Sequence, residues 1–547
     1  MRRGNRNIVW LCLLGALLWR GPLWALTPRE LTDPVEALSR ASAPLNGVES
    51  LLAAQERDAV RAYREKLIEE GRSDAANRVR CLEELYAGNN AGALQALELL
   101  EKKDAWATSR VNYLTGLMDV QRSFARTKSD HFIFLTRSED AFLGPTALPS
   151  LENAYARVAE FFGSSPTVAV QVEVYPTVDS FVFASTLSRE TIERTGAVAS
   201  VAFGRVMALS PEATAFGYRW MDFLVHEYVH SNLTRVSGGN CPIWLQEGTA
   251  RFLETGWRRP EGFTHTPSAR ALLTRAVLSD TSTVSGLLTF GSMEPSFLRL
   301  ESQEKASLAF AETSDAVDFI VREFGQEKLR DLLIAFRSKT RAEAFQSTLG
   351  MTEAEFEKNW RDSLADLTEV PTELARGALT ESIRLGTGED LSLVGPDIQN
   401  FLRLGDRLRQ QGSLNGAIVE YKKAVDLEPD NGVALTRLAR AYVGAEKASS
   451  AEELLKRVME KNHAYASSFV MLGDLFFDDG RYEEAQTVLQ QALEINPFHP
   501  KIHEVLGLIA VDVGNFVLAR QSLNLALRFD PNNDAVRQAL KRMPKGR

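Results

Sequence analysis

The stretch "LVHEYVHSNLTRVSGGNCPIWLQEGTARFLE", residues 224–254, decides how the middle of the chain folds. It holds two histidines four positions apart, His226 and His230, with Glu227 directly after the first. On an α-helix, side chains at i and i+4 lie on one face, one turn apart, so both imidazoles can reach a single ion. Glu227 lies about 100° around such a helix, where it can act on a water molecule without binding the metal. The spacing therefore predicts a metal-binding helix.

The alternative is an amphipathic helix in which the pattern is accidental. Only seven histidines occur in the chain, so a chance match to His-Glu-x-x-His is rare. Zinc in a hydrolytic site usually takes three protein ligands and leaves one position for water. Glu247, 17 residues after His230, is the candidate third ligand. Between them, Gly238, Gly239 and Pro242 predict a turn that returns a second helix onto the first.

This combination resembles the glutamate-zincin (gluzincin) metallopeptidases. "WLQEGTARFLE" is similar to the "WL-x-EG-x-A" element shared by aminopeptidases of that clan and by the peptidase MA-like domains of bacterial proteins. The resemblance covers about residues 129–365 and includes the helical ending "FIVREFGQEKLRDLLIAF". It implies an α+β zincin-like domain, a peptide substrate laid along an edge strand around residues 198–209, and hydrolysis by a zinc-activated water. The zinc ligands it implies are His226, His230 and Glu247, with Glu227 as the general base.

The same resemblance implies a tyrosine or histidine that stabilises the oxyanion. In "AFAETS", residues 309–314, Phe310 stands where peptidase MA-like domains carry a tyrosine. His265, in the loop "GFTHTP", is the one histidine left downstream in the domain and is the candidate donor. Arg251 or a backbone amide are the other possibilities.

Two further residues near the ligands have two interpretations each. Glu254 lies one helical face beyond Glu247 and is either a hydrogen-bonding partner of a ligand histidine or a solvated helix glutamate. Cys241 lies in the loop between the ligands, where a plain thiol is favoured over a fourth ligand.

In the region before the motif, the spacing of apolar residues changes from a helical pattern to one typical of β-strands. Residues 26–128 carry apolar positions at helical spacing, and "LYAGNNAGALQALELLEKKDAW" is typical of a turn between two antiparallel helices. "HFIFL" (131–135) and "TVAVQVEVYP" (167–176) then predict strands, separated by the amphipathic helix "LENAYARVAEFFG". "GAVASVAFGRVMALSP" (196–211) is rich in small and β-branched residues and predicts the edge strand. A mixed α+β region thus leads into the metal helix.

The last part of the chain repeats at intervals of 34 residues. Three columns share this interval: Gly405, Ala439, Gly473 and Gly507; Ala417, Ala451, Ala485 and Ala519; and Pro429, His463, Pro497 and Pro531. The pattern resembles the tetratricopeptide repeat (TPR) family over residues 398–540, in about four units, with residues 366–397 as a linker. Val458 and His463 depart from it in the second unit. The resemblance implies an all-α superhelix whose concave face binds a protein partner, the alternative being repeats that only brace the enzyme. Gly88, Ala93 and Leu97 have the spacing of Gly412, Ala417 and Tyr421, so residues 26–128 are a possible degenerate relative.

Residues 1–25 predict an export signal. Arg2, Arg3 and Arg6 precede an apolar run over residues 8–19, and Ala25 offers a small residue for cleavage. That run is shorter than the roughly 20 residues that span a bilayer, so membrane contact is expected at most through an uncleaved N-terminal segment. The expected location is the periplasm or cell envelope of a bacterium. Cys81 and Cys241 would remain after cleavage, and we expect them to be free thiols.

The length of the chain predicts the number of domains, and its net charge bears on the class of partner. A chain of 547 residues predicts two to four domains, and a formal net charge of -9 argues against a nucleic-acid partner. We expect a multidomain protein: a helical N-terminal region, an α+β zincin-like domain and an all-α TPR superhelix. The expected function is an exported zinc metallopeptidase whose repeats recruit a partner or substrate. The alternative is a catalytically weak or inactive zincin-like domain in a TPR scaffold or assembly protein.

Overall fold

The computed structural model describes residues 26–544 except 28–29, 42, 260–261, 280–285, 368–382 and 462–463. The described residues divide into two compact units. The first comprises those of Met1–Leu209, Met221–His265 and Ala276–Thr368, and the second those of Ser210–Trp220, Thr266–Arg275 and Glu369–Arg547. The predicted export signal, His463 and much of the predicted linker lie outside the described residues. Within the described ranges, no helix combines the length and apolar character that crossing a bilayer requires.

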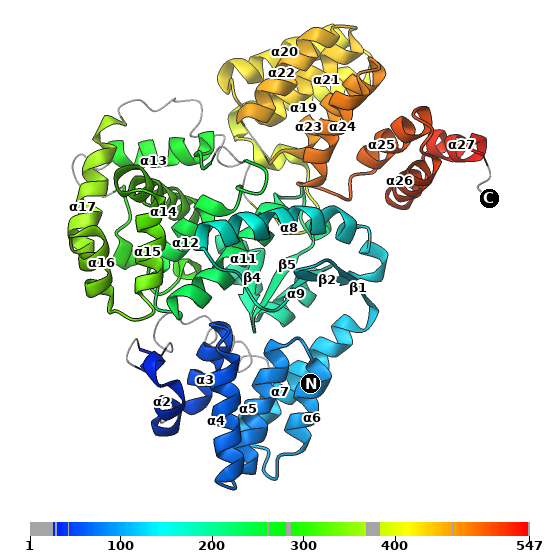
Figure 1. Cartoon of the computed structure of the whole chain (residues 1–547). Coiled ribbons are helices and arrows are strands. Elements are labelled where there is room, and N and C mark those ends of the chain that lie inside the picture. Colours follow the sequence, from blue (N-terminus) through cyan, green and yellow to red (C-terminus); the bar gives the residue numbers. More distant parts are fainter. Residues whose placement is uncertain are drawn as a thin grey trace, which may run out of the picture. The chain divides into compact units, whose positions relative to one another are not determined.

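Helices form the N-terminal part of the first unit, as predicted (Figure 1). The turn predicted in "LYAGNN" joins two of them, with Gly88 at φ 75° and the Asn89 side chain accepting the backbone N–H of Gly92. That cap satisfies one of the free N–H groups at the start of a helix. The helices are α2 (Pro34–Arg40), α3 (Pro44–Ala53), α4 (Arg57–Glu69), α5 (Ser73–Tyr86), α6 (Asn90–Glu98) and α7 (Ala105–Val120).

A five-stranded mixed sheet follows, in the order β1-β2-β3-β5-β4. β2, β3 and β5 are parallel, while β1 and β4 pair antiparallel at the two edges. Helix α8 (Leu143–Phe162) provides the crossover that joins parallel β2 to β3. Helices α9 (Val178–Ser185) and α10 (Arg189–Thr195) connect β3 to the edge hairpin. The strands are β1 (Phe124–Lys128), β2 (Phe132–Arg137), β3 (Val170–Tyr175), β4 (Ala199–Ala202) and β5 (Arg205–Leu209).

Two details of this sheet correct the sequence-based expectation. The sheet begins at Phe124, so the boundary between the helical region and the α+β domain lies before residue 129. The stretch 196–211 forms a hairpin of two strands rather than a single edge strand. Its turn is Phe203-Gly204, with φ angles of 52° and 69°. Positive φ at both central residues is the geometry of a type I′ hairpin turn, which alternation of apolar residues alone does not reveal.

The rest of the first unit is helical and packs around aromatic side chains. The indole of Trp244 stacks 3.9 Å from the ring of Phe290 and 5.7 Å from that of Phe356. Thr340 and Thr352 form capping boxes at the start of the last two helices, which explains the predicted helical ending. The helices are α11 (Trp220–Ser237), α12 (Ile243–Leu253), α14 (Gln303–Phe324), α15 (Gln326–Ala335), α16 (Arg341–Leu349) and α17 (Glu353–Ser363).

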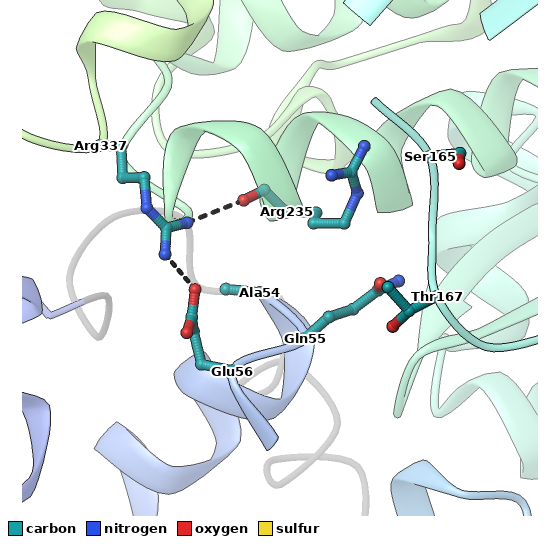
Figure 2. Close-up of a pocket in the computed structure, with 7 residues that line it drawn as sticks. All are labelled: Ala54, Gln55, Glu56, Ser165, Thr167, Arg235 and Arg337. Carbon is teal, nitrogen blue, oxygen red and sulfur yellow. Dashed lines mark hydrogen bonds and ion pairs between the residues drawn. The ribbon is translucent and has the colours of Figure 1, made fainter. Parts of the chain in front are cut away.

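The N-terminal helices are tied to the C-terminal end of α11. Arg337 donates from Nη1 to the backbone carbonyl of Arg235 at 3.0 Å, and its other amino group pairs with Glu56. Figure 2 shows both interactions at the edge of a small pocket that is also lined by Gln55 and Thr167. The last carbonyls of a helix lack intrahelical partners, so the guanidinium satisfies one of them.

The second unit contains four helix pairs and a terminal helix, which confirms the predicted repeats. Close packing between the two helices of a pair explains why small residues recur at the position of Gly405. A Cβ atom on Gly405 would lie 2.4 Å from the ring of Tyr421, and one on Gly473 would lie 2.5 Å from Leu489. The pairs are α19 (Pro396–Gln410) with α20 (Leu414–Leu427), α21 (Gly432–Gly444) with α22 (Ala448–Lys461), α23 (Ala466–Asp478) with α24 (Tyr482–Leu493) and α25 (Pro500–Asp512) with α26 (Phe516–Phe529), followed by α27 (Asp534–Arg542).

Two pieces of the sequence assigned to the α+β domain belong to this second unit: residues 210–220 and part of α13 (Pro267–Ser279). Residues 210–220 contact the turn after α24. Tyr218 donates its backbone N–H to the carbonyl of Ile495 at 3.0 Å, and the Trp220 indole N–H donates to the carbonyl of Leu493 at 3.0 Å. The predicted domain boundaries did not include this docking, because single hydrogen bonds to backbone carbonyls leave no periodic signal in a sequence.

Candidate metal centre

Two helices joined by a glycine turn position the candidate ligands. Helix α11 carries His226, Glu227 and His230, and α12 carries Glu247. Between them, Gly238 and Gly239 have φ angles of 65° and 80°. Two successive left-handed residues suit glycine, because it has no Cβ to clash with the backbone. The turn predicted from the glycines therefore brings α12 back toward α11.

Gly248, directly after Glu247, allows a close approach by a third helix. A Cβ atom at this position would lie 2.3 Å from the backbone carbonyl oxygen of Thr313 on α14. Glycine in the "EG" step is thus required for α12 to pack on α14. That packing places the helix carrying Phe310 next to the ligand helices.

The three candidate ligands converge on one point. Nε2 of His226 and Nε2 of His230 each lie 3.3 Å from Oε2 of Glu247, and the two Nε2 atoms lie 3.1 Å apart. The exposed fractions of His226, His230 and Glu247 are 8%, 5% and 4%. The structure thus brings together all three residues that the motif predicts.

These separations fit a tetrahedral zinc ion. Zinc binds imidazole nitrogen and carboxylate oxygen at about 2.0–2.2 Å, and tetrahedral angles then put two ligand atoms about 3.3 Å apart. The two imidazole nitrogens also face each other at hydrogen-bond distance, an arrangement that requires a proton or a cation between them. The donor set of two imidazoles and a carboxylate is that of a catalytic zinc site with one open position.

Glu254 orients the first ligand. Its Oε2 lies 3.0 Å from Nδ1 of His226, and its other carboxylate oxygen accepts a hydrogen bond from Arg251. Of the two interpretations of Glu254, the structure therefore supports the hydrogen-bonding partner, with 5% of the residue exposed. A carboxylate on Nδ1 holds the proton there and leaves the Nε2 lone pair for a metal.

The charges within the cluster are strongly coupled. Burial disfavours the His226 cation, yet hydrogen bonds and charge from Glu247 and Glu254 raise its pKa to about 10. Burial also opposes ionisation of Glu247, but the His230 charge and the bonds from both imidazoles outweigh it and lower its pKa to about 2. The cluster therefore keeps Glu247 ionised, as a metal ligand must be.

Glu227 is buried beside the ligands. Its Oε2 has no hydrogen-bond partner among the described residues. Burial raises the pKa of this carboxyl, while the two histidine charges and a backbone hydrogen bond from Val201 on β4 lower it. A buried acceptor without a partner normally costs free energy, which is often the mark of a functional group. Glu227 can therefore accept a proton from a water molecule or a substrate.

Phe310 lies next to the metal ligands, where its side chain offers no hydrogen bond. The ring of Phe310 meets that of His226 edge-on, with centroids 5.8 Å apart, and packs against Phe297 at 5.1 Å. The position aligned with the family tyrosine is thus close to the predicted site.

His265 and Cys241 lie outside the ligand set. Nε2 of His265 is 3.0 Å from Oδ2 of Asp315, whose other oxygen accepts the indole N–H of Trp360 at 2.8 Å. The contacts of His265 within the described ranges are with Asp315 and Phe263 rather than with a candidate ligand. Cys241 is buried, and burial raises the pKa of its thiol. Cys81 and Cys241 are both free, as predicted.

Sequence reasoning missed two contributors to the site. The carbonyl of Thr313 lies against Gly248, next to the ligand Glu247, and the N–H of Val201 lies close to Glu227. Backbone groups occur in every residue, so no pattern of side chains could have identified them. The "EG" step was the one available signal for the close approach on α14.

Comparisons with known proteins agree with the two-part organisation. Residues 150–366 match the family described as Peptidase MA superfamily, and residues 396–537 match the tetratricopeptide repeat protein 21 C-terminal ARM domain. The chain is 32% identical over 93 residues to DnaJ homolog subfamily C member 3 of Rattus norvegicus, which is 17% of this chain and 18% of that protein. The Homo sapiens protein of the same name is 29% identical over 93 residues and is likewise covered over 18% of its length.

Solved structures with similarity to part of the chain include the following two. The crystal structure of MamA has 26% sequence identity and a TM-score of 0.23, and the match covers 24% of this chain and 78% of that one. The first TPR of Spaghetti (RPAP3) bound to an HSP90 peptide has 26% identity and a TM-score of 0.21, covering 21% of this chain and 93% of that one.

Proposed function

We propose that this chain, which joins a Peptidase MA superfamily domain to tetratricopeptide repeats, is a zinc-dependent metallopeptidase. The observation that carries the proposal is the convergence of His226, His230 and Glu247, with ligand atoms 3.1–3.3 Å apart. Glu227 lies beside them with a buried carboxylate oxygen that has no partner among the described residues. A structural helix pair would not need three converging ligand atoms and an acid with one buried oxygen that lacks a partner among the described residues.

In the proposed reaction, His226, His230 and Glu247 hold zinc. When bound, the ion would polarise the scissile carbonyl and acidify a water molecule. Glu227 takes a proton from the water as its oxygen bonds to the carbonyl carbon, and then gives that proton to the amine as the C–N bond breaks. Burial of Glu227 keeps bulk water from competing for the proton.

The edge strand β4 supports an extended peptide as the substrate. It has one sheet neighbour, β5, and lies at the end of the strand order. The backbone of Val201 on β4 lies close to the Glu227 carboxyl, so the strand runs beside the proposed base. An extended chain can add to such an edge through backbone hydrogen bonds.

The repeats support a role in recruiting a protein partner or substrate. Stacked TPR units form extended concave surfaces, and such surfaces bind peptides in other proteins. Residues 1–25 support export to the periplasm or cell envelope. Fractionation of a bacterial host that expresses the full chain tests the location, and recovery from the cytoplasm alone would contradict export.

Metal analysis and peptide digestion of the full-length protein test the peptidase. We expect about one zinc per chain in wild type, Glu227→Gln and the control Glu323→Gln, which changes an exposed glutamate on α14. Wild type and Glu323→Gln should cleave peptides from a proteome-derived library, whereas Glu227→Gln should lose activity by orders of magnitude. A metal-free wild type, or full activity in Glu227→Gln, would refute the proposal.

A catalytically weak domain in a repeat scaffold is the second candidate function. The observation that favours it is Phe310, which places a hydrocarbon ring beside His226 where relatives are expected to carry a donor. Full zinc occupancy without cleavage of any library peptide would support this candidate over the enzyme.

A further inference from the structure

The turn of the edge hairpin has an unusual backbone. Phe203 adopts a φ of 52° and Gly204 a φ of 69°, between β4 and β5. Glycine adopts this conformation readily, but a bulky residue such as phenylalanine rarely does. A conformation of this kind persists where the surrounding structure holds it in place.

The Phe203 side chain is inserted in the core of the N-terminal helices. It is 5% exposed, and it belongs to a cluster of buried residues from α5, α6 and α7. Its ring centroid lies 5.4 Å from that of Tyr113 and 6.0 Å from that of Tyr86, and the Arg110 guanidinium lies 5.2 Å from it.

A second anchor follows two residues later. Arg205, the first residue of β5, is 1% exposed and pairs with Glu173 on β3 at 3.2 Å. Its Nη2 also donates to the backbone carbonyl of Leu85 at 2.8 Å and to Oδ1 of Asn90 at 2.7 Å. These bonds engage both amino groups of the buried guanidinium and pair its charge, while its Nε has no partner among the described residues. A paired buried charge of this kind holds β5 against β3 and the N-terminal helices. Both anchors attach the hairpin to the helical region.

The hairpin also reaches the proposed base. Val201 lies two residues before Phe203, and its backbone N–H lies close to the Glu227 carboxyl. Along an antiparallel strand, N–H groups alternate between the partner strand and the outer edge. The Val201 N–H is therefore on the outer edge of β4, and that edge faces Glu227.

We propose that Phe203 is a positioning residue, through which the N-terminal helical region sets the edge of β4 beside Glu227 to receive an extended peptide. The inference rests on the proposed peptidase function. β5 has two neighbours in the sheet, but β4 has one, so β4 depends more on its anchor at the turn. The helical region is accordingly part of the peptide-binding apparatus.

Hydrogen exchange and kinetics of the zinc-loaded full chain test this inference. The variants are Phe203→Ala, which removes the anchor, and Phe203→Leu, which keeps part of the apolar contact. The control is Leu67→Ala on α4, a buried residue of a separate cluster among the N-terminal helices. Amide exchange over residues 199–202, zinc content, KM and kcat are measured for each.

We expect Phe203→Ala to speed exchange over residues 199–202 at least about tenfold and to raise KM for peptides by a similar factor, with zinc content unchanged. Phe203→Leu should show smaller changes in the same direction. Leu67→Ala should lower thermal stability while leaving β4 exchange and KM at wild-type values. A purely structural role for Phe203 would not separate the two alanine variants.

Unchanged exchange in both Phe203 variants would overturn the inference. Faster exchange with an unchanged KM would also overturn it, because the peptide would then not depend on β4. If Phe203→Ala does not fold, Phe203→Leu supplies the same comparison. A wild type that cleaves no peptide would refute the proposed function instead, and the exchange data would still decide whether Phe203 anchors β4.

Discussion

Nδ1 of His226 lies 3.0 Å from Oε2 of Glu254, and the second oxygen of that carboxylate pairs with Arg251. The three side chains form a line that ends at the ligand atom of His226. Its effect is to set the direction of the imidazole and the location of its proton. Glu254 and Arg251 therefore fix the orientation of the His226 imidazole before any metal binds.

Replacing Glu254 by glutamine should weaken zinc binding. The amide keeps the size of the side chain but loses the charge that favours the Nδ1 proton, so we expect a loss of affinity of about 10–100-fold. Competition with a chelator measures it in the full chain. Glu323→Gln, on the exposed side of α14, is the matched control. Equal affinity in wild type and Glu254→Gln would show that the contact does not tune the ligand.

Replacing Phe310 by tyrosine should raise peptidase activity. The ring lies 5.8 Å from the His226 ring, so a hydroxyl there would sit near the reacting groups. Removing an oxyanion donor from other enzymes costs about 10²–10³ in kcat, and we expect a gain of about tenfold or more from adding one. The control is Phe297→Tyr, on the neighbouring ring. A kcat that does not rise in Phe310→Tyr, with zinc retained, would contradict this prediction.

Replacing His265 by alanine should affect stability rather than turnover. Its Nε2 bonds to Asp315 and its ring packs on Phe263, so the substitution breaks a contact between the loop and α14. We expect a loss of about 1–3 kcal/mol, because a buried aspartate oxygen loses its partner. Thermal unfolding and steady-state kinetics check both parts. A fall in kcat at unchanged stability would restore His265 as a donor to the oxyanion.

Replacing Glu312 by glutamine should stabilise the protein at high pH. Burial raises the pKa of Glu312 to about 8, although the Leu288 backbone N–H donates to the carboxyl. Between the ordinary pKa of 4.5 and 8, the folded state holds a proton that the unfolded chain has lost. Stability therefore falls as pH rises through this window.

Glutamine removes that dependence while its Oε1 can still accept from Leu288. We expect Glu312→Gln to gain more than about 1 kcal/mol over wild type at pH 8.5 and little at pH 4.5. Unfolding midpoints at the two pH values measure the difference. Parallel pH profiles for wild type and Glu312→Gln would contradict the prediction.

Reversing the ion pair between Arg219 and Glu494 should reveal how residues 210–220 are held in the second unit. The two groups lie 2.9 Å apart and are largely buried, with side-chain exposures of 11% and 20%. We expect Arg219→Glu alone to cost about 1–3 kcal/mol, since it leaves two like charges together. Adding Glu494→Arg should recover part of the loss. A double variant no more stable than the single one would argue against direct pairing.

Local patterns determined much of this protein from its sequence alone. The spacing of His226 and His230 placed two imidazoles on one helical face, because the period of an α-helix is a property of the backbone. The small residues that recur every 34 positions from Gly405 and Ala417 identified the repeats, because the two helices of each unit pack closely at these positions. Glu247 could be selected as the third ligand because the glycine turn predicted a second helix returning onto the first, and because "WLQEGTARFLE" resembles an element of the gluzincin family.

Tertiary structure alone decided the remaining features. Glu254 had two equal interpretations until its distance to His226 was known, and His265 turned out to bond to Asp315, 50 residues further along the chain. No pattern in the sequence indicated the backbone contact of Val201 with Glu227. None indicated that Phe203 is anchored in the N-terminal helices. Such contacts join residues far apart in sequence, and they depend on how whole helices and strands pack rather than on any repeating pattern of side chains.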